Sequence, residues 1–116
     1  MFKSVKEQDS FKNTQTHYYL TQGDSCTITA TPYKNGTIEI GVTKCVFKLA
    51  TPDYKLVKKI EITKQETNGA FVIYLSSTDT ASLNAGSYIY EIEYTIGDEV
   101  QTPNSWKFDI VKQITE

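Results

Sequence analysis

Apolar and polar residues alternate with a period of two along most of this chain. In residues 26–31, Cys26, Ile28 and Ala30 alternate with threonines, and in residues 71–75 every second residue (Phe71, Ile73 and Leu75) falls on one face. Successive side chains of a β-strand point to opposite faces, so each run predicts a strand with one buried face. No segment keeps a helical period for roughly ten residues. The sequence therefore predicts an all-β fold.

Turn signals divide the alternating runs into short strands. Asn35-Gly36, Asn68-Gly69 and Gly97-Asp98 are typical of tight turns, because asparagine and glycine tolerate positive φ. A chain of 116 residues is enough for one domain. We expect an antiparallel β-sandwich of seven to eight strands.

The longest predicted strand spans residues 88–96. Its tyrosines Tyr88, Tyr90 and Tyr94 share one face with isoleucines. This face could be a carbohydrate-binding platform, but the regular spacing favours a core face. One short helical turn is expected near residues 78–83, where capping residues precede a segment too short for a longer helix.

Residues 1–15 differ from the rest of the chain and are interpreted as an N-terminal arm. They are polar and lysine-bearing, with Phe2, Val5 and Phe11 scattered among them. Such an arm is either flexible or fixed to a neighbouring protein by its apolar residues. We assign residues 16–116 to the sandwich. The first residues lack the apolar stretch of a signal peptide, so synthesis in the cytoplasm is expected.

The chain is poor in groups that bind metals or form disulfides. Cys26, Cys45 and His17 are its only cysteines and histidine, which is too few for a zinc site. We expect no metal and no cofactor. A disulfide would require the two cysteines to lie on facing strands, and two buried thiols are the favoured alternative.

Catalytic groups are also scarce. His17 has no recognisable motif around it and is interpreted as a surface or rim residue. Glu91 and Glu93 point to the same side of one strand, where a solvated sheet face is favoured over acid–base catalysis. No glycine-rich phosphate loop or dinucleotide motif is present. We expect a protein that is not an enzyme.

Charge argues against nucleic acid and membrane as partners. The chain has twelve Lys or Arg residues, all of them lysine, and a net charge of -2. Arginine, the residue best suited to bases and phosphates, is missing. The cluster Lys55, Lys58, Lys59 and Lys64 is interpreted as a protected edge strand. No apolar run is long enough to span a membrane.

Four stretches form a recognisable set. They are LTQGD at residues 20–24, NGAFVIYL at residues 68–75, the pattern T-x-x-L-x-x-G-x-Y-x-Y at residues 80–90, and Thr102 followed by the apolar strand that ends at Ile110. Together they cover about five sixths of the chain. On these stretches, residues from about Tyr18 to Thr115 resemble an Ig-like domain of tailed-phage virion proteins. The resemblance is to the N-terminal domain of the phage baseplate upper protein family.

The chain departs from that family in two ways. The usual DLTG element after the first hairpin is replaced by TIEIG at residues 37–41, and the long C-terminal regions of family members do not follow. The resemblance therefore implies an Ig-like β-sandwich that acts as a decoration, fibre-anchor or adaptor protein of the virion. The missing arginine agrees with a phage of low-GC bacteria.

The resemblance implies a structural role in a baseplate, tail or head-fibre assembly. Other virion proteins would be the partners, and a homo-oligomer is reasonable. Partner-binding residues are expected in the arm and just after it: Phe2, Val5, Phe11, Tyr18 and Tyr19.

The alternative is a carbohydrate- or receptor-binding module that uses exposed tyrosines. Tyr18, Tyr33, Tyr54 and Tyr74 are its candidate contact residues.

Overall fold

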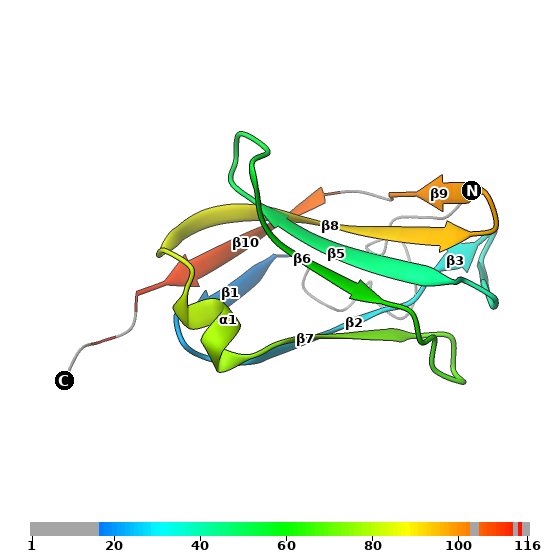
Figure 1. The fold of residues 1–116 in the computed structure, drawn as a ribbon, viewed down its shortest axis with the longest axis horizontal. Coiled ribbons are helices and arrows are strands. Elements are labelled where there is room, and N and C mark those ends of the chain that lie inside the picture. Colours follow the sequence, from blue (N-terminus) through cyan, green and yellow to red (C-terminus); the bar gives the residue numbers. More distant parts are fainter. Residues whose placement is uncertain (1–16, 103–104, 113, 115–116) are drawn as a thin grey trace.

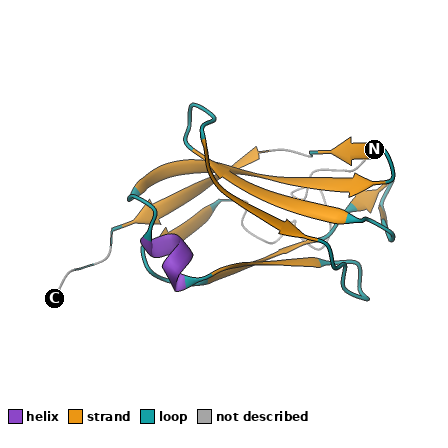
Figure 2. Ribbon diagram, viewed as in Figure 1, coloured by secondary structure: helices purple, strands orange, loops and turns teal. Residues whose placement is uncertain are grey.

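The protein folds almost entirely into β-strands, as the alternation predicts. A computed structural model describes residues 17–102, 105–112 and 114. Figure 2 shows its strands in orange and its short helix in purple. The strands are β1 (Tyr18–Thr21), β2 (Cys26–Ala30), β3 (Tyr33–Lys34), β4 (Thr37–Ile38), β5 (Lys44–Ala50), β6 (Leu56–Ile62), β7 (Phe71–Leu75), β8 (Gly86–Ile96), β9 (Glu99–Gln101) and β10 (Ser105–Val111). The helix α1 (Ser77–Ala81) lies between β7 and β8.

The described residues contain ten strands, more than the seven to eight that we expected. Three of the strands are very short: β3 and β4 have two residues each, and β9 has three. Asn35 and Gly36 join β3 to β4 with φ angles of 54° and 81°. Two successive positive φ values define the tight hairpin turn that this dipeptide predicts.

The strands form two facing layers (Figure 1). The larger sheet has the order β1-β10-β8-β5-β6, and β9 also pairs with β8. The sheet of β2 and β7 faces it, and β3 and β4 form a separate hairpin. Except for β1 and β10, the described strand pairs are antiparallel, whereas β1 and β10 pair in parallel. The fully antiparallel prediction is wrong at this pair. No hairpin joins β1 to β10, so the connection does not fix their relative direction.

The core lies between the two layers and follows the predicted alternation. Phe47, Phe71, Tyr94 and Phe108 are completely inaccessible to solvent. The rings of Phe71 on β7 and Tyr94 on β8 lie 6.2 Å apart across the layers. The tyrosine face of β8 is therefore a core face, as the spacing of its tyrosines predicts. Truncating one of these buried rings to alanine typically costs about 3–5 kcal/mol.

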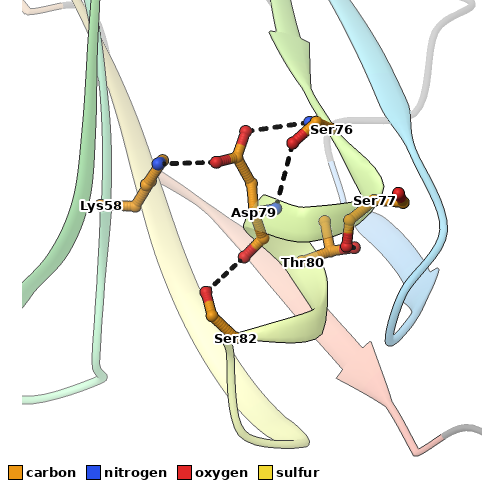
Figure 3. A network of polar contacts seen from close by, with 6 residues as sticks. All are labelled: Lys58, Ser76, Ser77, Asp79, Thr80 and Ser82. Carbon is orange, nitrogen blue, oxygen red and sulfur yellow. Dashed lines mark hydrogen bonds and ion pairs between the residues drawn. The ribbon is translucent and has the colours of Figure 1, made fainter.

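A capping box starts the helix α1 (Figure 3). The backbone N–H of Asp79 donates to Ser76 Oγ at 3.1 Å, and the backbone N–H of Ser76 donates to Asp79 Oδ2 at 2.9 Å. These bonds satisfy N–H groups that the first helical turn leaves without partners. Lys58 Nζ on β6 donates to Asp79 Oδ1 at 2.8 Å, which fastens the helix to the edge of the large sheet. The helical turn was expected near residues 78–83. The helix overlaps this segment and begins one residue before it, at Ser77.

Candidate functional site

The predicted contact residues fall into two groups. Phe2, Val5 and Phe11 lie outside the described residues. Tyr18 is half-buried, and its ring centroid lies 5.8 Å from that of Phe108 in the core. Tyr19 points to the other side of β1 and is 65% exposed. Tyr19 is therefore the more accessible of the two tyrosines to a partner.

Tyr19 belongs to a small polar cluster at the start of β1. Its ring stacks on His17 with the centroids 4.1 Å apart. His17 Nε2 lies 2.6 Å from Asp109 Oδ2 on β10. The hydrogen bond with His17 is the main reason why the pKa of Asp109 is lowered. This arrangement holds the imidazole at the rim of the sheet and ties the first described strand to the last.

The two cysteines are free thiols, so the disulfide left open above does not form in this structure. Cys45 is buried on β5, and burial raises the pKa of its thiol to about 12. A thiol in such a site is unreactive. Cys26 is only half-buried, which differs from our expectation of two buried thiols. It is the first residue of β2, where the strand enters the sheet.

Two of the stretches that carry the resemblance are hydrogen-bonded to each other. Gln22 Nε2 donates to the carbonyl of Leu83 at 2.6 Å. The hydroxyl of Thr80 accepts from the N–H of Gly23 at 3.1 Å and donates to the carbonyl of Asp24 at 2.7 Å. The QGD turn and the helix-to-strand segment therefore form one unit, which we call the turn–helix lock (Gln22–Asp24 with Thr80 and Leu83).

The glycine and tyrosine of these stretches also have structural roles. Tyr88 Oη donates to the carbonyl of Asn84 at 2.6 Å, so the ring packs under the corner where the chain enters β8. Gly69 has φ of 90°, and a Cβ there would lie 2.3 Å from Ile38 Cγ2. A side chain at residue 69 would therefore be strained by its backbone conformation and would force the Ile38 side chain on β4 to shift.

The outer face of the large sheet carries a different kind of site. On β5, Ala50 lies between Leu56 of β6 and Ile89 of β8 in the strand register. Two residues earlier on β5 and on the same face, Lys48 lies between Lys59 and Glu91. An apolar row thus runs beside a charged row, and its central residue is the smallest.

A pocket of about 330 Å³ opens over these two rows. Its lining is Lys48, Ala50, Tyr54, Leu56, Lys59, Ile89 and Glu91. Tyr54 is 71% exposed, as expected for a candidate contact residue. The other lining residues come from three strands, and we did not predict them as a group. Their grouping depends on the strand register, which a single sequence does not reveal.

Tyr54 lies in the β5–β6 loop in a conformation that is unusual for its residue type. Its φ is 68°, in the left-handed region. The loop is closed by hydrogen bonds from the N–H of Tyr54 to the carbonyl of Thr51 at 2.8 Å and from the N–H of Thr51 to the carbonyl of Lys55 at 2.9 Å. A bulky residue with positive φ is an outlier, and such outliers gather at functional sites.

Charged residues on the same face are largely paired. Lys48 Nζ lies 3.0 Å from Glu93 Oε2, and Lys44 Nζ lies 3.5 Å from Glu61 Oε1. Glu91 and Glu93 are half-buried on this face, which is less solvated than we expected. The lysine-rich strand β6 is at the edge of the sheet in the described part of the chain, as predicted.

The described residues show neither a metal-ligand cluster nor a membrane-spanning helix. They contain no group of three or more His, Cys, Asp or Glu side chains that could hold a metal ion. No helix among them has the length and apolar character needed to cross a membrane.

Comparison with known proteins adds no relative: no protein-family model matches the chain, and no curated protein matches it. The resemblance to phage virion domains therefore depends on the quoted stretches alone.

Proposed function

We propose that this protein is an Ig-like β-sandwich that serves as a structural component of a tailed-phage virion. It acts by protein–protein assembly in a baseplate, tail or head-fibre structure and has no enzymatic activity. Its partners are other virion proteins, with copies of itself as a further partner. After synthesis in the host cytoplasm it is found in the virion.

The turn–helix lock is the observation that carries this proposal. The stretches at residues 20–24 and 80–90 both carry the resemblance, and although they are far apart in the sequence they are hydrogen-bonded partners. The bond from Tyr88 to Asn84 supports an Ig-like domain, since such a tyrosine corner is a hallmark of that fold. The strand order, with β2 and β7 facing a sheet that ends in β1 beside β10, is compatible with it.

Binding would use the N-terminal arm and the adjacent exposed ring of Tyr19. Deletion of residues 1–15 should leave the domain folded, because the described strands already enclose a core of their own, from Ile28 on β2 to Ile110 on β10. The same deletion should abolish incorporation into particles. Mass spectrometry of purified virions, grown with the deleted gene in place of the original, measures this loss. Tyr74→Ala is the control, because Tyr74 is exposed on the other sheet at β7. Normal incorporation of the deletion variant contradicts the proposal.

A second candidate function is carbohydrate or receptor binding through exposed tyrosines. The pocket beside Tyr54 favours it, because an exposed aromatic ring lies there next to an apolar floor and polar side chains. Tyr74 is also exposed, whereas Tyr18 and Tyr33 are half-buried.

A further inference from the structure

We propose that the pocket beside Tyr54 binds one pyranose ring of an uncharged saccharide. This inference rests on the second candidate function and gives it a site and a ligand class. It does not depend on the arm or on assembly into a particle. Three features of the pocket carry it: its shape, the conformation of Tyr54 and the balance of charges.

The shape follows from the row of residues that forms the floor. Ala50 is flanked across the sheet by the longer side chains of Leu56 and Ile89. A methyl group between two larger residues leaves a hollow with an apolar floor. The volume of about 330 Å³ lies at the lower end of the range of roughly 300–1,000 Å³ for ligand pockets. It suits a small ligand of the size of one sugar ring.

The conformation of Tyr54 indicates that its side chain has a use. Glycine would adopt the φ of 68° without steric cost, yet the loop has a tyrosine there. The ring is 71% exposed beside the apolar floor. The negative face of an aromatic ring attracts groups with partial positive charge, such as the C–H groups on one face of a pyranose.

The charges of the pocket favour a neutral, hydroxyl-rich ligand. Lys48 is held by Glu93 at 3.0 Å, and Lys59 and Glu91 remain on opposite sides of it. An anion would meet Glu91, and a cation would meet the two lysines. Lysine only donates hydrogen bonds and a carboxylate only accepts them, whereas a hydroxyl does both. Sugar hydroxyls therefore match Lys59 and Glu91 together.

Titration of the isotope-labelled protein with glucose, galactose and N-acetylglucosamine, followed by NMR, tests the proposal. At least one sugar should shift the backbone amides of Ala50, Tyr54, Leu56 and Ile89, and the shifts should saturate with a common Kd in the millimolar range. The absence of saturable shifts with all three sugars would overturn the proposal. So would saturable shifts centred on Tyr19 or Tyr74.

Two variants with matched controls sharpen this test. Ala50→Leu fills the hollow and should weaken binding by roughly tenfold or more, whereas Ala81→Leu, the same change at an exposed position of α1, should leave the Kd unchanged. Tyr54→Ala should weaken binding, and Tyr74→Ala should not. Unchanged binding by Ala50→Leu overturns the proposal. Ala50→Leu should still enter virions; if it does not, and no sugar binds, the pocket is a protein-docking site and the proposal is wrong.

Discussion

At the scale of single residues, the backbone conformation of Tyr54 lowers the stability of the fold. Left-handed backbone costs an L-residue roughly 1–2 kcal/mol, and Tyr54 has φ of 68° while its ring remains mostly exposed. The ring therefore recovers little of this cost by burial. Replacing such a residue by glycine removes the steric cost of the left-handed backbone.

Tyr54→Gly should raise the free energy of unfolding by about 0.5–1 kcal/mol, because glycine avoids the steric cost but loses more chain entropy on folding. Urea denaturation with and without the substitution measures the difference. Tyr74→Gly is the matched control and should lower stability, since Tyr74 is an exposed tyrosine inside strand β7. A loss of stability in Tyr54→Gly would mean that the ring makes stabilising contacts.

Val46 shows where residue-level prediction fails. Strict alternation on β5 puts it on the polar side with Lys44 and Lys48, yet it is only 1% exposed. In the strand register it lies between Glu61 and Glu93, which pair with those two lysines. Long charged side chains cover apolar surface with their stems. The period of two predicts which way a side chain points, but burial also depends on neighbours from other strands.

At the scale of elements, the turn–helix lock joins a turn at one end of the chain to the helix before β8. Thr80 is completely buried, and its hydroxyl bonds to backbone groups of both Gly23 and Asp24. The short helix is thereby held by two different elements, since Lys58 of the opposite sheet also binds the neighbouring Asp79 (Figure 3). These motif residues have structural roles.

Thr80→Val keeps the shape of the side chain but removes the hydroxyl. It leaves the N–H of Gly23 and the carbonyl of Asp24 without this partner, and we expect a loss of about 2–3 kcal/mol in the free energy of unfolding. Chemical denaturation measures it. Thr78→Val makes the same change at an exposed position of α1 and should alter stability by less than about 0.5 kcal/mol. Equal effects of the two changes would show that the lock contributes nothing.

At the scale of the whole molecule, two carboxylates tie distant elements together. Asp79 joins α1 to β6, and Asp109 joins β10 to His17 at the start of β1. The pKa of Asp79 is lowered chiefly by its hydrogen bond from Lys58, and that of Asp109 chiefly by its hydrogen bond with His17. Both groups therefore hold protons less tightly in the folded protein than in the unfolded chain.

A lowered pKa gives a definite sign to the pH dependence. Each carboxylate stabilises the fold above the ordinary value of 3.8, and this stabilisation is lost as the pH falls through 3.8 toward the lower folded value. The double variant Asp79→Asn/Asp109→Asn should be about 1–2 kcal/mol less stable than the original near pH 7. The two curves of unfolding free energy should converge in acid. Asp98→Asn, in an exposed turn, is the control. A constant gap at all pH values would contradict the prediction.

The sequence predicts the strands and the turns well, because both depend on local chemistry. Asn35-Gly36 and the tyrosines of β8 are examples. It does not predict the pocket, because Ala50, Leu56 and Ile89 become neighbours only through the register of three strands. Nor does it predict the parallel pairing of β1 with β10, because no hairpin turn in the sequence connects these two strands.

That parallel pair affects how the protein emerges from the ribosome. Tyr18 pairs with Phe108, ninety positions later in the chain. At a synthesis rate of about 5–20 residues per second, β10 is synthesised roughly 5–20 s after β1. During this interval the apolar sides of Tyr18 and Leu20 have no sheet to join. Completion of the large sheet therefore has to await the synthesis of β10, and until then the strand edge of β1 is open to pairing with other chains.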